Sequence, residues 1–304
     1  MLTTRVAHDA ATARMTALSA EVGKLQAAIA TGQRIASADD DPAGAARLAA
    51  IDRALATAAS ERNGIDRAAT RLTATDAALG GVGTMLQRAK EIALAGGTAT
   101  LNAADRATLA AEAGQLSEQL NGYANTRDSD GASLFAGART GGAAYVADAS
   151  GAMRWQGAGT AAVLALDDGA IPTGIDGPQA FDGLPAAAGT TDAFALLTSL
   201  GAALGEPDPA RRAAALAAAQ SGLDAAISRT ADTRATVGTR LARLDTETAR
   251  LDAATTALAT DQTKTGSLDM TVAIARLQRL TTVLQAAQLS FVKVAGLNLW
   301  DYLR

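Results

Sequence analysis

Apolar residues recur at alternating steps of four and three along residues 51 to 93. Nine of the thirteen positions that this alternation marks are apolar, and so are all seven at strict seven-residue spacing. This spacing places the side chains in one stripe along an α-helix, the pattern by which long helices pack side by side. A second, weaker stripe with the same spacing runs from Leu223 to Leu258. The two stripes predict two long helices that pair with each other.

Capping residues mark where the helices begin. Asp41 with Pro42, and Asp208 with Pro209, each place a carboxylate at the N-cap and proline at the first helical position, where its missing N–H costs nothing. A helix over 209 to 262 would be about 80 Å long at about 1.5 Å per residue. The other helices are expected at 3 to 33, 43 to 95, 103 to 126 and 268 to 296.

Residues 133 to 190 differ from the helical parts. They hold three of the six prolines and short alternating pieces such as AAYVAD and AMRWQG, joined by glycine-rich turns. Short strands fit this pattern better than helices do. The expected fold is mainly α: an elongated antiparallel helical rod or coiled coil formed by the N- and C-terminal halves, with a small inserted β-rich domain. In chain order we expect an assembly helix at 1–41, the first part of the rod at 42–132, the insertion at 133–190, the second part of the rod at 191–264 and another assembly helix at 265–304.

The first and last helices each carry one apolar stripe. Helices of this length draw most of their stability from packing, so we expect the two stripes to pack on each other and on neighbouring subunits. The closing AGLNLWDYLR adds an apolar cluster at an end that would otherwise fray. The expected assembly interface comprises Leu18, Val22, Leu25 and Ile29 in the first helix, Leu277, Leu280, Leu284 and Phe291 in the last, and Leu297, Leu299, Trp300, Tyr302 and Leu303 at the C-terminus.

Composition argues against catalysis and against several classes of partner. Without cysteine, the chain has no thiolate chemistry, and its one histidine, His8, lies near the N-terminus. A net charge of −4 with no basic run gives no reason to expect nucleic acid or an anionic membrane. The alternative is an enzyme or ligand-binding protein whose site lies in residues 133–190. That segment has no histidine, and its one pair of carboxylates is Asp167 with Asp168, so it offers little for catalysis. We expect that the protein is not an enzyme and that it binds no metal or cofactor.

Three motifs have both a chemical and a structural interpretation. SADDDP, at 37 to 42, offers three carboxylates for a cation, but adjacent side chains point in different directions and helix capping is favoured. TRDSDG, at 126 to 131, begins like a calcium loop but has Gly137 where such a loop requires glutamate, so a turn is expected. GGVG, at 80 to 83, lacks the Lys-Ser/Thr of a phosphate loop, so close helix packing is expected.

Four motifs, two of them near the chain ends, resemble a known family. They are TGQRIASADDDPAGAARLAAIDRAL at 31–55, LQRAKEIALAGG at 86–97, YANTRDSDGASLFAG at 123–137 and LNLWDYL at 297–303. Together they resemble the flagellin superfamily and, within it, the hook-associated protein 3 family of the hook–filament junction. The resemblance covers roughly the first 140 and the last 90 residues.

The resemblance implies a structural protein that assembles through its terminal helices. Copies of the chain would form a ring-like or helical layer, with the terminal helices innermost and the insertion outermost. The implied partners are the other junction protein and, through it, the filament, with an export chaperone on the C-terminal helix beforehand. The implied location is extracellular, in the flagellum, reached through the flagellar type III apparatus. The alternative is a filament flagellin or flagellin-like surface protein, which shares the fold and differs in position and copy number.

Overall fold

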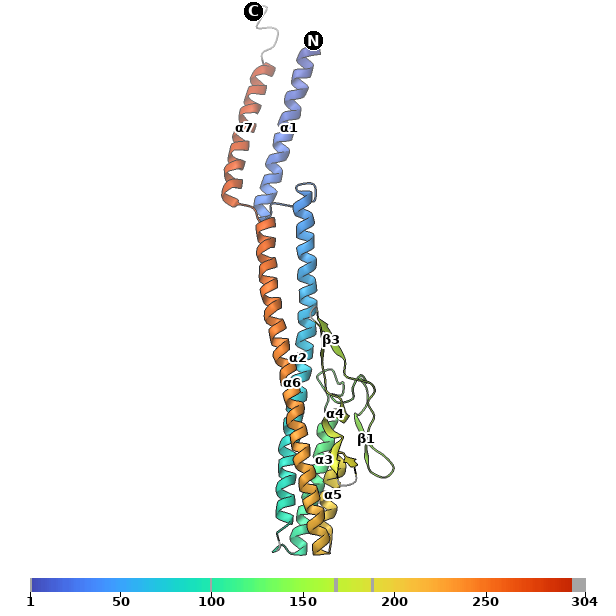
Figure 1. Ribbon diagram of the computed structural model, residues 1–304. Coiled ribbons are helices and arrows are strands. Elements are labelled where there is room, and N and C mark those ends of the chain that lie inside the picture. The colour runs from blue at the N-terminus through green and yellow to red at the C-terminus, as the bar shows by residue number, and fades with distance from the viewer. Residues whose placement is uncertain (1, 99, 167–168, 187–188, 297–304) are drawn as a thin grey trace, which may run out of the picture. The chain divides into compact units, whose positions relative to one another are not determined.

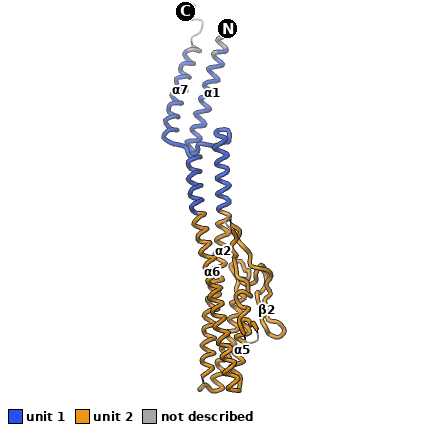
Figure 2. Tube along the Cα trace, in the orientation of Figure 1, with its two compact units in different colours: residues 1–58, 252–304 blue, residues 59–251 orange. Residues whose placement is uncertain are grey.

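A computed structural model of the protein describes residues 2–98, 100–166, 169–186 and 189–296 (Figure 1). Two compact units divide the chain: residues 1–58 with 252–304, and residues 59–251 (Figure 2). The helices are α1 (Leu2–Thr31), α2 (Pro42–Gly96), α3 (Ala103–Ala124), α4 (Gly177–Phe181), α5 (Ala193–Gly205), α6 (Pro209–Gly266) and α7 (Met270–Gly296).

Six short strands form three antiparallel hairpins in the inserted segment. The pairs are β1 (Tyr145–Ala147) with β2 (Met153–Trp155), β3 (Val163–Leu166) with β4 (Gly169–Pro172), and β5 (Leu184–Ala186) with β6 (Gly189–Thr191). The expectation of a mainly helical chain with a small strand-containing insertion is therefore confirmed. The structure also places the short helix α4 within the insertion, where only strands were expected.

Helices α2 and α6 pack antiparallel within residues 59–251. Arg234 Nε donates to Asp76 Oδ1 at 2.9 Å, and Lys90 Nζ lies near Asp224 Oδ1, so positions later in α2 meet positions earlier in α6. The seven-residue spacing explains this pairing, because it brings one apolar stripe of each helix to the contact. The buried stripe residues are Ile65, Leu72, Leu79 and Leu86 in α2, and Leu223, Val237, Leu244 and Leu251 in α6.

One glycine of the GGVG motif allows α2 and α3 to approach closely. A Cβ added at Gly81 would lie 2.5 Å from Tyr123 Cε1 in α3, whereas one added at Gly80 would lie 3.7 Å from the nearest atom, Arg234 Cζ. Close helix packing was expected at this motif, and the structure has it at Gly81.

We predict opposite effects for alanine at these two glycines. Gly81→Ala should lower the free energy of unfolding by about 1–3 kcal/mol, since the methyl group forces Tyr123 or the α3 backbone to move. Gly80→Ala is the matched control. It should leave the free energy of unfolding unchanged or raise it by up to about 1 kcal/mol, because alanine favours the helix more than glycine does. Urea denaturation followed by circular dichroism would measure both. Equal effects would contradict the close approach at Gly81.

Helix α5 was not predicted. Its apolar residues cover several faces, so they form no single stripe, and they pack against α3 and the insertion. Asp192 starts the helix by accepting a hydrogen bond from the amide of Ala195 at 2.7 Å. The buried residues of α5 are Ala193, Phe194, Leu196, Leu197, Leu200, Ala203 and Leu204.

An aromatic cluster forms the core of the insertion. The rings of Phe135 and Tyr145 contact Phe181, and those of Tyr145 and Phe181 contact Phe194 of α5, with ring centroids 4.9 to 5.9 Å apart. The chain has nine aromatic residues, so these four are nearly half of them. Trp155 adds a hydrogen bond from Nε1 to the carbonyl oxygen of Phe135, at 2.9 Å. The cluster therefore joins the inserted segment to α5.

Arginines of the long helices hold the insertion by polar contacts. Arg71 of α2 forms an ion pair with Asp128 and donates to the carbonyl oxygen of Ser133 at 2.8 Å. Arg240 of α6 donates to the carbonyl oxygen of Gly174 at 2.6 Å. Asp128 also accepts the amide of Ala132 at 2.8 Å, which closes the turn expected for TRDSDG.

Candidate assembly site

The two terminal helices pack antiparallel within the unit formed by residues 1–58 and 252–304 (Figures 1 and 2). Glu21 Oε1 accepts a hydrogen bond from Arg276 Nη2 at 2.6 Å. Farther from the connecting segments, the rings of His8 and Phe291 have their centroids 4.7 Å apart. The N-terminal part of α1 thus lies beside the C-terminal part of α7.

A short backbone bridge at Gln33 and Ser267 fixes where the helix pair begins. The amide of Arg34 donates to the carbonyl oxygen of Gly266 at 2.8 Å, and the amide of Leu268 donates to that of Gly32 at 2.9 Å. These bonds hold the segments between α1 and α2 and between α6 and α7 against each other. They set the register of α1 against α7.

The apolar stripes expected from the sequence meet inside this pair. Val22 is 9% exposed, and the other seven predicted residues of α1 and α7 are half-buried. Ala273 and Ala287, which belong to the expected stripe of α7, are also covered, and the structure extends the stripe of α1 with Ala11 and Met15, which were not predicted. Continuing the same four-and-three spacing toward the N-terminus would have identified Ala11 and Met15. The remaining predictions, at Leu297, Leu299, Trp300, Tyr302 and Leu303, lie outside the described residues.

A second set of apolar residues lies on the outside of α7. Ten large apolar side chains of the described residues are exposed, and six of them belong to this helix. Five of the six fall outside the four-and-three spacing, so sequence reasoning missed them; Met270 continues that spacing by one step before Ala273. They are Met270, Val272, Ile274, Val283, Leu289 and Val292, with exposed fractions from 42% to 67%. That neighbouring subunits contact the terminal helices stays a prediction.

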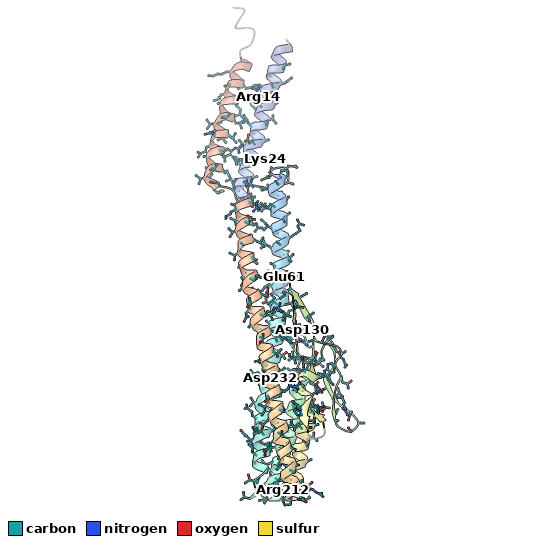
Figure 3. All side chains as sticks on the ribbon, in the orientation of Figure 1. Arg14, Lys24, Glu61, Asp130, Arg212 and Asp232 are labelled. Carbon is teal, nitrogen blue, oxygen red and sulfur yellow. The ribbon has the colours of Figure 1, made fainter. Side chains whose placement is uncertain are left out.

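The carboxylates of SADDDP cap backbone amides near the start of α2. Asp41 accepts the amide of Gly44 at 2.9 Å and a bond from Arg34 Nη1 at 3.0 Å, and these two interactions lower the pKa of Asp41. Asp40 accepts the amides of Ala36 and Ser37. Lys24 of α1, which is labelled in Figure 3, has its Nζ 3.6 Å from Asp40 Oδ1. The connection from α1 to α2 is therefore ordered by its own acidic residues.

The start of α6 has a similar cap. Asp208 Oδ1 accepts the amide of Ala210 at 2.8 Å, and Pro209 is the first helical residue.

Among the described residues, no group of three or more His, Asp and Glu side chains could hold a metal ion. Within those same residues, no helix is long and apolar enough to span a membrane.

Comparison with known protein families supplies two matches, one at each end of the chain. Residues 2–140 match the bacterial flagellin N-terminal helical region, and residues 221–303 match the bacterial flagellin C-terminal helical region. The inserted segment beyond residue 140, with α4 and α5, lies between the two matches. The two matched regions contain both terminal helices, all of α2 and α3, and most of α6.

Two curated proteins are similar along most of their length. Flagellar hook-associated protein 3 of Escherichia coli strain K12 is 28% identical over 292 residues, which cover 90% of this chain and 90% of that protein. The protein of the same name from Salmonella typhimurium strain LT2 is 26% identical over 260 residues, or 81% of each chain.

A solved structure has the same fold. The flagellar junction protein FlgL from Legionella pneumophila superposes with a TM-score of 0.62 at 16% identity, over 72% of this chain and 99% of that chain. At this identity the likeness concerns the fold alone.

Proposed function

The chain belongs to the flagellin superfamily, and from this premise we propose that it is a structural protein of the bacterial flagellum, forming the junction layer between hook and filament. The observation that carries the proposal is the similarity to hook-associated protein 3 over 90% of both chains. A match to the flagellin regions alone would fit a filament subunit equally well. The proposal includes no catalytic role.

Copies of the chain assemble through their terminal helices. The pairing of α1 with α7 buries one stripe of each helix within the chain, and the exposed apolar residues of α7 are left for neighbours. Burying apolar surface contributes about 25 cal/mol per Å², so several such side chains on each copy favour a closely packed layer. The predicted cluster from Leu297 to Leu303 would extend the same surface.

The proposed partners follow from the position of this layer. The chain contacts further copies of itself, the hook on one side, and on the other side the second junction protein, which connects to the filament. Before assembly, an export chaperone covers the C-terminal helix, and the chain leaves the cytoplasm through the flagellar type III apparatus. An exposed apolar helix such as α7 would promote aggregation in the cytoplasm without such a cover.

Deletion of the gene tests the proposal. We expect hooks without filaments in electron micrographs, and flagellin released into the medium, because filament subunits would have no layer to attach to. A plasmid copy of the gene should restore filaments. Long filaments that persist after deletion would refute the junction role, and loss of the filament with a complete junction would favour the filament-flagellin alternative.

A further inference from the structure

Asp182 of the insertion carries a carboxylate that has a hydroxyl donor but no cation. Its Oδ1 accepts a hydrogen bond from the hydroxyl group of Tyr145 in β1 at 3.2 Å, and Tyr145 is 3% exposed. Asp182 itself is half-buried and directly follows α4. In the part of the chain that the structure describes, neither Asp182 nor Asp192 forms an ion pair.

Three elements bring titratable or charged side chains toward Asp182. Tyr145 faces it from β1, and Asp192 faces it from the N-cap of α5. Arg229 of α6 donates to the backbone carbonyl oxygen of Gly183 at 3.4 Å and not to the carboxylate of Asp182. Two carboxylates and a phenol therefore meet beside the aromatic cluster, and no bond from a cation neutralises them.

Burial and the charge of Asp192 raise the pKa of Asp182, and they outweigh the hydrogen bond from Tyr145, which lowers it. A carboxyl group whose pKa is raised by folding is harder to ionise in the folded chain than in the unfolded chain. Its contribution to stability is therefore complete in acid and is lost as the pH rises through the folded-state pKa. The adjacent ring of Phe181 contacts Tyr145 and Phe194, so this loss falls on the contacts that join the insertion to α5.

We propose that Asp182 is a proton-dependent latch, which holds the inserted segment to α5 more tightly in mildly acidic than in neutral solution. Protonated Asp182 keeps its hydrogen bond with Tyr145 and places no second negative charge near Asp192. Ionised Asp182 carries a partly buried charge without a cation, so the contacts of the cluster weaken. The inference concerns the insertion and does not rest on the proposed junction role.

The variant Asp182→Asn in the full-length chain tests the latch. Asparagine removes the charge and keeps an oxygen that can accept the hydroxyl group of Tyr145. Trp155 donates to the carbonyl oxygen of Phe135 in the cluster, so its fluorescence in a Trp300→Phe background would follow urea unfolding of the insertion. We expect equal stability with and without the substitution near pH ~3.5, below the ordinary aspartate pKa of about 3.9. Near pH ~7.5 the variant should be the more stable, by about tenfold in the unfolding equilibrium constant for each unit by which folding raises the pKa of Asp182.

Asp148→Asn is the matched control in the same insertion. Hydrogen bonds from Ser150 and Arg154 lower the pKa of Asp148, so its charge favours the folded chain, and this contribution is lost as the pH falls through the folded-state pKa. Asp148→Asn should therefore reduce stability at neutral pH, with a difference from wild type that narrows in acid. The two substitutions make the same change in net charge and should have opposite effects at neutral pH.

The hydrogen bond from Tyr145 supplies a second arm. Tyr145→Phe removes the donor that stabilises ionised Asp182, so its cost should be larger at neutral than at acidic pH. In the Asp182→Asn background the cost of Tyr145→Phe should not depend on pH, because no charge remains to be stabilised. Carbon-13 NMR titration of the Asp182 carboxyl group in the wild-type chain would measure its pKa directly.

Two results would overturn the latch. One is an Asp182→Asn chain that is no more stable than wild type at neutral pH, as expected if Arg229 neutralised the carboxylate. The other is an Asp182 carboxyl group that titrates at or below the ordinary value of about 3.9. The NMR titration uses the wild-type chain, so it decides the matter even where a variant fails to fold.

Discussion

Replacing Leu284 with aspartate is expected to abolish filament attachment in cells that carry this variant as their sole copy. Leu284 is half-buried in the stripe of α7 that packs on α1, and a carboxylate placed there has no described cation in its own stripe to pair with. Burying such a charge costs several kcal/mol, which should weaken the pairing of α1 with α7 enough to block assembly. Electron microscopy of complemented deletion cells would measure the effect.

The unit formed by residues 59–251 should stay folded in this variant. Leu284 lies in the other unit, so the main thermal transition followed by circular dichroism should shift little. Val283→Asp is the matched control: Val283 is 46% exposed, so an aspartate there stays in contact with water and the pair of α1 and α7 should keep its resistance to proteolysis. Loss of the main transition in Leu284→Asp would show that the terminal pair and the rest unfold together. Normal filament attachment would contradict the assembly role of the stripe.

Replacing Arg71 with methionine should have the largest effect on the stability of residues 59–251. The side chains of Arg71 and Asp128 are 19% and 11% exposed, so both charges are largely removed from water. Methionine would leave Asp128 without its cation and the carbonyl oxygen of Ser133 without that donor. Breaking a buried pair from one side costs about 3–5 kcal/mol, and urea denaturation of the purified chain would measure it.

A double-mutant cycle separates the ion pair from the packing of the arginine stem. The double variant Arg71→Met with Asp128→Leu should recover much of the loss, because it leaves no charge buried alone. Asp128→Asn should cost less than Arg71→Met, since asparagine can still accept the amide of Ala132. A change below about 1 kcal/mol in Arg71→Met would mean that water solvates the pair.

The long helices were predictable because two local signals coincide in them. Seven-residue spacing sets the buried stripe, and an acidic cap followed by proline sets the start, so α2 and α6 begin and end within a few residues of the expected limits. Helix α5 has the cap, Asp192, but no single stripe, because several of its faces are covered. The contact of Arg71 with Asp128 joins residues 57 positions apart and has no local pattern in the sequence.

The candidate assembly site was predictable in part for a related reason. Spacing identifies the stripes of α1 and α7 that pack together, since that packing needs regular contact along both helices. It does not identify the exposed apolar residues of α7, such as Val272, Val283 and Leu289, which have no partner in the described chain. Which residues become buried on assembly depends on the shape of the partner's surface, and the sequence of one chain contains no information about that surface.

The backbone bridge between Gln33 and Ser267 also determines how the terminal helices respond to competition. It anchors the C-terminal end of α1 beside the N-terminal end of α7, so each helix meets the other at an effective concentration that short tethers typically raise to the millimolar range. A free peptide copied from α7 would need a comparable concentration to displace α7 from α1. At micromolar concentrations it would leave that pair intact, and any inhibition of assembly would come from surfaces that the pair leaves uncovered.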